Sequence, residues 1–356
     1  RTDVLYVDAN AIGAGDGSTW SNAYVNLQDA LLSTHLFREV WVAAGTYAPG
    51  VVRSSSFLLP PGVSLYGGFS GVELERSERD WSLNPTILSG DLGIPGDSSD
   101  NAYHVVIGSD RSVLDGFSVT AGNASMNFLE DDRGIGAGLW ADGITMSVEN
   151  CKFYNNQARQ SGGAAYLMES NASFNNCEFS DNMGFGGFGM GGAISTNFST
   201  LHLQNCSFID NSTDLQGGAI LSDASEINLK NCTFQNNQNT VNKGGGAIYL
   251  SGGRLIDEDG NYTGNQSAAQ GGAIKVEFAD VILSGSTFQL NQSSYSGGAG
   301  HVLDSNLSMQ DCRFLSNVSA GNTGGALHLE NLSHFQDANS LYPVSYTHLR
   351  AHETQR

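Results

Sequence analysis

The stretch CKFYNNQARQSGGA at residues 151–164 contains both halves of a unit that recurs seven times between Ile144 and Leu327. The first half reads C-x-F-x-x-N, and the second half reads G-G-A, followed in most copies by an aliphatic residue. Successive aromatic anchors are 26 to 29 residues apart. Two linked motifs that recur in phase indicate a repeat protein, in which each unit stacks on its neighbours.

Three columns of equivalent residues follow from this repeat. The aromatic anchors are Phe153, Phe179, Phe208, Phe234, Tyr262, Phe288 and Phe314. The Asn residues three positions later are Asn156, Asn182, Asn211, Asn237, Asn265, Asn291 and Asn317. The Gly-Gly-Ala triplets end at Ala164, Ala193, Ala219, Ala247, Ala273, Ala299 and Ala326.

The apolar residues upstream of each anchor alternate with polar ones, which is the pattern of a β-strand. Segments rich in Asn, Ser and Gly separate these strands and leave no room for the helix or comparable crossover of a leucine-rich repeat, which excludes that class. A propeller is excluded as well, because its blades are longer, at about 40 to 50 residues. The sequence therefore predicts an all-β fold, a right-handed parallel β-helix. Because parallel strands lie about 4.8 Å apart, the seven coils should form a section roughly 30 Å long.

Each column then has an expected structural role. The aromatic rings should point inward and stack, the Asn amides should form a hydrogen-bonded ladder, and Gly-Gly should adopt backbone conformations that a Cβ would forbid. All five Cys residues lie two positions before an anchor, where the other two repeats have Gly260 and Ser286. We expect a small buried slot with unpaired thiols, because side chains stacked in parallel have poor disulfide geometry. No His or CxxC accompanies the thiols, so they predict no metal site.

The first 143 residues are expected to form an N-terminal cap and the first coils. Residues 26–35 predict a helix with Asn26 as its N-cap, and strand-like runs follow at 39–43, 63–69, 86–89, 103–107 and 112–120. A helical cap would protect the open end of the solenoid. We expect one continuous solenoid over residues 1–342, with the repeats at 144–342.

The repeat resembles that of the polymorphic outer membrane protein family, whose signatures are FxxN and GGA[ILV], over roughly residues 144–330. The front of the chain, including YVDANAIGAGDGSTWSNAY (6–24), LYGGFSGVE (65–73) and ERDWSLNPTILSGDLG (78–93), is similar to a module of secreted bacterial β-helix proteins. Such proteins resemble the pectin-lyase-like superfamily. The resemblance implies export to the extracellular or outer-membrane surface of a bacterium, with a signal peptide and a C-terminal anchor outside this sequence.

The last fourteen residues, PVSYTHLRAHETQR (343–356), depart from the repeat. They resemble a translated sequencing-adaptor read, so we expect a non-native tail and a natural chain that continues differently after Tyr342.

Composition limits the possible partners. The chain of 356 residues has 36 acidic and 16 basic residues, a net charge of −20, and 45 Gly. The acidity argues against binding to nucleic acid, whose phosphates require basic surfaces. No run of 18 apolar residues is present, so no transmembrane helix is expected in this segment. We expect a monomer.

Candidate functional residues come from the register after each Gly-Gly-Ala, where the second residue should point outward. That row reads Tyr166, Ser195, Leu221, Tyr249, Lys275, His301 and His328, and two residues further the row reads Met168, Asn197, Asp223, Ser251, Glu277, Leu303 and Glu330. Tyr rings suit sugars, and Lys or His beside carboxylates suits acid–base chemistry. The predicted ligand-binding residues are Tyr166, Tyr249, Lys275, Glu277, His301, His328 and Glu330; no residue is designated as catalytic or metal-binding. A plain solvated sheet face is the alternative.

Asp257 stands where the other repeats have an inward apolar residue. An ionised carboxylate there would be costly, so we expect a one-residue slip that places Ile256 inward and leaves residues 257–259 in a bulged loop. That loop, or the acidic loop with Asp91, Asp97 and Asp100, offers oxygen ligands for Ca²⁺; otherwise no cofactor is expected.

The leading functional hypothesis is a non-catalytic surface passenger that binds surface glycans or proteins of a host or neighbouring cell, as an adhesin does. One alternative is a polysaccharide lyase or glycoside hydrolase that acts on the outward face at 249–330. A passive structural stalk is the other.

Overall fold

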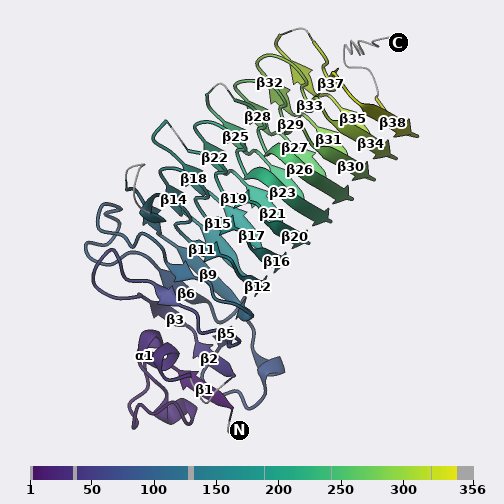
Figure 1. The fold of residues 1–356 in the computed structure, drawn as a ribbon. Helices are drawn as coiled ribbons and strands as arrows, with labels where there is room; N and C mark the ends of the chain where they lie inside the picture. Colours follow the sequence, from purple (N-terminus) through teal and green to yellow (C-terminus); the bar gives the residue numbers. More distant parts are fainter. Residues whose placement is uncertain are drawn as a thin grey trace.

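The structure, a computed structural model, describes residues 3–34, 38–126, 132–187, 189–241, 243–321 and 323–342. The chain forms a right-handed parallel β-helix, which confirms the predicted fold class. Figure 1 shows the coils stacked along one axis, with the N-terminus at one end and β38 near the other. The predicted non-native tail at 343–356 lies outside the described residues.

Among the described residues, parallel pairing between successive coils builds three sheets, of 20, 10 and 8 strands. The large sheet has 20 strands: β1 (Val4–Val7), β2 (Glu39–Ala43), β4 (Phe57–Leu58), β5 (Ser64–Phe69), β7 (Val106–Ile107), β8 (Ser112–Asp115), β11 (Leu139–Asp142), β12 (Thr145–Glu149), β15 (Ala165–Met168), β16 (Asn171–Asn175), β19 (Ile194–Asn197), β20 (Thr200–Gln204), β23 (Ile220–Lys230), β26 (Ile248–Glu258), β29 (Ile274–Glu277), β30 (Asp280–Ser284), β33 (Gly300–Leu303), β34 (Asn306–Gln310), β37 (Leu327–Glu330) and β38 (His334–Ala338). It contains the strands after each Gly-Gly-Ala and those before each anchor.

The middle sheet has 10 strands and carries the aromatic anchors: β3 (Gly45–Tyr47), β6 (Thr86–Ser89), β9 (Phe117–Thr120), β13 (Lys152–Tyr154), β17 (Glu178–Ser180), β21 (Ser207–Ile209), β24 (Thr233–Gln235), β27 (Asn261–Thr263), β31 (Thr287–Gln289) and β35 (Arg313–Leu315). The short sheet has 8 strands: β10 (Asn123–Ala124), β14 (Gln157–Ala158), β18 (Met183–Gly184), β22 (Ser212–Thr213), β25 (Gln238–Asn239), β28 (Gln266–Ser267), β32 (Gln292–Ser293) and β36 (Val318–Ser319).

The N-terminal helix α1 (Leu27–Leu32) covers the first coil. The side chain of Asn26 caps it by accepting a hydrogen bond from the Gln28 amide at 2.9 Å, as expected for this N-cap. Its apolar face is buried, and the helix packs against β1, β2 and β4. The helix is shorter than predicted, and the expected end at His35 lies outside the described residues. 3₁₀ turns are found at Trp20–Asn22, Arg76–Glu78 and Asp132–Gly134.

The predicted strands of the front are found with one clear difference. β2 and β6 have the expected bounds, and the run at 112–120 is divided into β8 and β9. The run at 103–107 contributes only β7, Val106–Ile107. His104 within that run bonds the carbonyl of Gly136 through its Nδ1, at 3.1 Å.

The aromatic column forms a stack inside the solenoid. Ring centroids of neighbouring anchors from Phe153 to Phe314 are 4.5 to 5.2 Å apart, with interplanar angles of 2 to 10°. Tyr342 extends the stack, 5.0 Å beyond Phe314. The anchors pair in register in the middle sheet, so the distance between neighbouring strands determines the distance between neighbouring rings.

The Asn column forms a continuous ladder beside the stack. The amide nitrogen of Asn211 donates to Oδ1 of Asn237 at 2.9 Å and to the carbonyl of Phe179 at 2.9 Å. Oδ1 of Asn211 accepts from both the backbone and the side chain of Asn182. The same pattern recurs along the ladder, whose seven members are at most 1% exposed. The ladder therefore satisfies buried polar groups at a turn of every coil.

The Gly pairs and the Cys slot also have clear physical causes. The first Gly of each pair has a positive φ, such as 65° at Gly162, and a Cβ on the second Gly of most pairs would approach the next coil's backbone too closely. All five Cys are free and buried. The Sγ of Cys206, for example, lies 3.4 Å from the Phe174 carbonyl of the preceding coil.

The expected register slip at Asp257 is wrong. Asp257 pairs with Leu229 on one side and Leu283 on the other, so it occupies the inward slot without any bulge. It is 0% exposed, and its Oδ2 accepts hydrogen bonds from the hydroxyls of Tyr262 at 3.1 Å and Ser286 at 2.9 Å. Gly260 makes room, because a Cβ there would lie 2.3 Å from this oxygen. The two hydroxyl donors therefore offset part of the cost of burying this carboxyl group, whose Oδ1 has no hydrogen-bond partner among the described residues.

Candidate functional site: an outward strip on the large sheet

The outward face of the large sheet gathers the predicted ligand-binding residues. Strand pairing aligns one row from Tyr166 to His328 and a second row from Met168 to Glu330. We call these two rows the outward strip. It contains Tyr166, Tyr249, Lys275, Glu277, His301, His328 and Glu330.

The C-terminal half of the strip is more shielded than an open sheet face. Tyr249, Lys275 and His301 are only 5%, 8% and 4% exposed. The loops before the Gly-Gly-Ala triplets contribute to this shielding: Nζ of Lys275 donates to the Lys243 carbonyl at 2.8 Å and to Oε1 of Gln270 at 3.2 Å. Register alone predicts which side chains point outward but not which loops cover them.

The N-terminal half of the strip is hollowed across β15, β19, β23 and β26. A cavity of about 350 Å³ is lined by Tyr166, Ser195, Asn197, Asp223, Tyr249 and Ser251, among others. Its wall combines hydroxyls, three side-chain amides and a carboxylate with the aliphatic side chain of Leu221. Nε2 of Gln160, also at this wall, is buried without a hydrogen-bond partner among the described residues. Such a lining can both contact the apolar face of a sugar ring and hydrogen-bond its hydroxyls.

Glu277 is fully engaged by its neighbours. The Tyr249 hydroxyl donates to Oε2 at 2.5 Å, and Nζ of Lys275 lies 2.9 Å from Oε1. Burial raises the pKa of Glu277, but the hydrogen bonds from Tyr249 and Lys275 outweigh it, and the pKa lies below its ordinary value. Glu277 is therefore an ionised carboxylate with both oxygens bound by neighbouring side chains, and it is poorly suited to act as a general acid.

His301 and His328 lie on neighbouring strands with parallel rings, 5.0 Å between centroids and 6° between planes. Burial, followed by the charges of His328 and Lys275, lowers the pKa of His301 to about 3. This imidazole is neutral near pH 7 and cannot supply a proton there. His301, His328 and Glu330 each offer one ligand atom within 4.8 Å of the others, and within the described ranges they are the only group of three or more metal-ligating side chains so close together.

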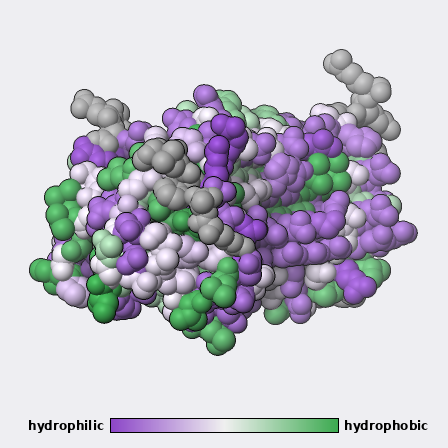
Figure 2. Space-filling model, turned by 90° about the horizontal axis from the view of Figure 1, so that it is seen from below, coloured by the Kyte–Doolittle hydropathy of each residue, from purple (hydrophilic) through white to green (hydrophobic). Residues whose placement is uncertain are grey.

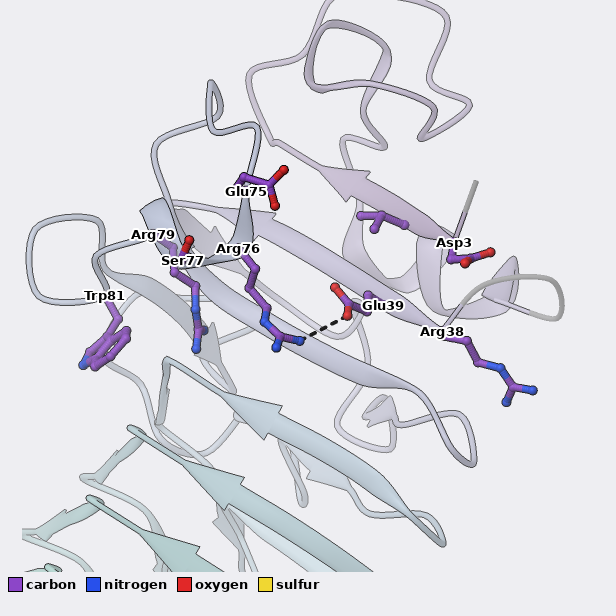
Figure 3. A pocket seen from close by; sticks show the side chains of 9 residues that line it. Asp3, Arg38, Glu39, Glu75, Arg76, Ser77, Arg79 and Trp81 are labelled. Atoms are coloured by element: carbon purple, nitrogen blue, oxygen red, sulfur yellow. Dashed lines mark hydrogen bonds and ion pairs between the residues drawn. The ribbon is translucent and has the colours of Figure 1, made fainter. Parts of the chain in front are cut away.

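A larger cavity, of about 850 Å³, lies at the N-terminal end, where the sequence singled out no residue (Figure 3). Arg38, just before β2, and Arg76 and Arg79, from the 3₁₀ turn Arg76–Glu78 and its C-cap, share it with Asp3, Glu39 and Glu75. Arg76 pairs with Glu39 at 3.1 Å, and Arg79 pairs with the buried Asp115. Acids thus balance the three guanidinium groups, and the cavity has no excess of positive charge to attract an anion.

The two acidic segments suggested for Ca²⁺ do not form compact oxygen clusters. Asp257 is buried, whereas Glu258 and Asp259 are exposed, so the three carboxylates do not share a face. In the other loop the carboxylates bind backbone amides: Asp91 accepts from Gly96, Asp97 from Ser99 and Asp100 from Ile94. The Ca²⁺ expectation stays a prediction.

Figure 2 shows hydrophilic side chains in rows over the C-terminal coils, with apolar residues in separate groups. Across the described residues, no helix is long and apolar enough to cross a membrane.

Residues 105–261 match the family model described as the right-handed β-helix region. No curated protein matches the chain. Among solved structures, the catalytic domain of GH87 α-1,3-glucanase in complex with nigerose is similar at 10% identity and a TM-score of 0.35, over 97% of this chain and 69% of that one. The Streptococcus pneumoniae surface protein and adhesin PfbA has the same identity and TM-score, over 94% of this chain and 100% of that one. Pectin methylesterase from Aspergillus niger is 13% identical, over 100% of this chain and 92% of that one, with a TM-score of 0.32. Likenesses this weak say nothing about the activity of this chain.

Proposed function

We propose that this chain is a non-catalytic carbohydrate-binding solenoid that holds an extended glycan along the outward strip, as part of an exported surface protein. The observation that carries the proposal is the cavity of about 350 Å³ between Tyr166 and Tyr249. It runs across neighbouring coils, so a linear chain of sugars can follow the axis of the rod. Its hydroxyl, amide and carboxylate groups match the hydroxyls of a neutral glycan.

The state of the acid–base candidates favours binding over catalysis. Both oxygens of Glu277 are occupied, Lys275 is held by three oxygen atoms, and His301 is neutral and buried. In the hollowed half, Asp223 is the only carboxylate that lines the cavity within the described residues. Glycoside hydrolysis by the common mechanisms needs two carboxyl groups that flank the bond. The arrangement therefore favours a binding strip.

A panel of immobilised glycans tests the proposal. We expect the wild-type protein to be retained by a subset of glycans and to release no products. Tyr166→Ala and Asp223→Asn should each weaken retention at least about tenfold, which corresponds to roughly 1.4 kcal/mol. Tyr295→Ala is the matched control, because Tyr295 is 53% exposed and does not line the cavity.

Each other outcome would overturn the proposal in a different way. Release of unsaturated or reducing ends would identify a lyase or a hydrolase. Retention that survives both substitutions would place the binding site elsewhere on the rod. Absence of retention across the panel would favour a passive stalk.

A further inference from the structure

The two His residues at the C-terminal end of the outward strip are brought together by the solenoid. His301 on β33 and His328 on β37 are 27 residues apart in the sequence but are direct cross-strand neighbours. Glu330 lies on the same strand as His328, and its Oε2 is 3.8 Å from Nε2 of His328. Two imidazoles and one carboxylate therefore meet at one point on the rod.

His301 carries a polar atom that the protein leaves unsatisfied. Its side chain belongs to a residue only 4% exposed, and Nδ1 is buried with no hydrogen-bond partner among the described residues. A buried polar atom without a partner costs about 1–3 kcal/mol, so such atoms are rare in folded proteins and call for an explanation. The Asn ladder, by contrast, satisfies the buried side-chain amides of its own column.

We propose that His301, His328 and Glu330 form a binding site for a transition-metal dication of the Zn²⁺ type. Imidazole nitrogen and carboxylate oxygen are ligands of Zn²⁺, Ni²⁺ and Cu²⁺, whereas Ca²⁺ and Mg²⁺ prefer sets of oxygen ligands. The site is separate from the proposed glycan cavity, and it stands or falls independently of that function.

The geometry requires a small closure, which the exposure of the residues permits. Zn–N distances of about 2.0–2.1 Å hold two nitrogens closer together than the 4.8 Å within which the three ligand atoms now lie. His301 is fixed by burial, but the side chains of His328 and Glu330 are 19% and 52% exposed and can move toward it. Three protein ligands leave a fourth position for water or another ligand.

The charge next to the site does not oppose a cation strongly. Lys275 precedes His301 in the row, but its ammonium group forms an ion pair with Glu277 at 2.9 Å. That pair is nearly neutral overall, and Glu330 adds a further negative charge at the site itself. The local balance therefore favours a dication.

Calorimetric titration of the untagged protein with ZnCl₂ and, separately, CaCl₂ tests the site. We expect one strong Zn²⁺ site per chain and no comparable Ca²⁺ site. His328→Ala should weaken Zn²⁺ binding by more than about 100-fold, since even the loss of an outer-shell partner costs 10–100-fold. His202→Ala is the matched control, because His202 is an exposed His on β20, outside the strip, and it should leave affinity unchanged.

A second measurement keeps the result independent of folding defects. Circular dichroism establishes whether His328→Ala and the double variant His301→Gln/His328→Ala retain the β-helix. Visible absorption of Co²⁺ in place of Zn²⁺ should show the bands of a four-coordinate site in the wild type and lose them in a folded His328→Ala. Equal Zn²⁺ affinity in wild type and folded His328→Ala, or no strong Zn²⁺ site in the wild type, would overturn the proposal.

Discussion

Two parts of the solenoid interior fill equivalent positions with different chemistry. In the coils around Phe208 the slot five residues before the anchor holds Leu203, and the small slot holds Cys206. Two coils later the anchor is Tyr262, which pairs with Phe234 of the coil between them. In this coil the slot five residues before the anchor holds Asp257, and the small slot holds Gly260. The residues that break the pattern of these three inward columns therefore all surround the Asp257 carboxyl group.

The difference shows that the departures act as a unit. Tyr262 supplies a hydroxyl where the other repeat anchors are Phe, Ser286 supplies a second hydroxyl from the small slot, and Gly260 removes the side chain that would collide with Asp257. Rings on both sides of Tyr262 remain stacked at 4.8 and 4.5 Å. The columns thus accept a buried acid without a change of register, provided that the contacting positions change together.

The largest effect is expected in the regular part, from Asn211→Ala. The substitution removes two donated hydrogen bonds, leaves the backbone amide of Asn182 without its acceptor, and takes one of two acceptors from the Asn182 side-chain amide. One orphaned buried amide costs about 1–3 kcal/mol and each of the three other lost hydrogen bonds about 1 kcal/mol, so the free energy of unfolding should fall by about 5 kcal/mol. Urea unfolding monitored by circular dichroism measures this. Asn228→Ala is the control, because the Asn228 side chain donates a surface hydrogen bond to Glu226 and takes no part in the ladder. This substitution should change the free energy of unfolding by no more than about 0.5 kcal/mol. Similar costs for the two variants would contradict a ladder that stabilises the fold.

The next effect is the pH dependence that Asp257 imposes. Burial raises its pKa from 3.8 to about 7. Between these values the folded chain keeps the proton while the unfolded chain loses it, so the free energy of unfolding should fall as pH rises from about 4 to 7 and then level off. At 1.36 kcal/mol per pH unit this amounts to about 4 kcal/mol. Asp257→Asn should remove this pH dependence. In urea titrations, the free energy of unfolding of the variant should therefore rise relative to that of the wild type between pH 5 and pH 8. A parallel pH profile in the two proteins would contradict a buried titrating Asp257.

A smaller effect separates the hydroxyl of Tyr262 from its ring. Tyr262→Phe restores the usual anchor but removes one donor to Asp257, which should cost about 1–3 kcal/mol at pH 8. In the Asp257→Leu background the same substitution should cost nothing. The Tyr262 hydroxyl has lost its acceptor there, so removing the hydroxyl removes a buried group without a partner. A double-mutant cycle measures the coupling. Equal costs in both backgrounds would show that the hydroxyl and the carboxylate do not interact.

The repeat made the fold and the inward columns predictable, because every position was observed seven times in register. The inward position of Asp257 could not be predicted from its own repeat position, because the hydroxyls that stabilise the carboxyl group lie five and 29 residues away, at Tyr262 and Ser286. The rows of the outward strip were predictable for the same reason as the columns. The shielding by the Lys243 and Gln270 loops was not, because those loops vary in length and sequence between repeats. The N-terminal cavity lies outside the repeats, and nothing in the sequence brings Arg38 and Arg76 together.

The smallest effect comes from exchanging the occupants of the small slot. Ser286→Cys places the usual thiol beside Asp257, and because a thiol is a weak donor the change should cost about 1 kcal/mol at pH 8. Cys206→Ser makes the reverse exchange in a regular coil. There the new hydroxyl can donate to the Phe174 carbonyl that Cys206 now contacts at 3.4 Å, so we expect a change within about 0.5 kcal/mol. Urea unfolding of the two single variants tests whether the slot distinguishes its neighbours. If Ser286→Cys costs no more than Cys206→Ser, the slot does not distinguish a hydroxyl from a thiol, and the hydroxyl of Ser286 has no specific role beside the carboxylate.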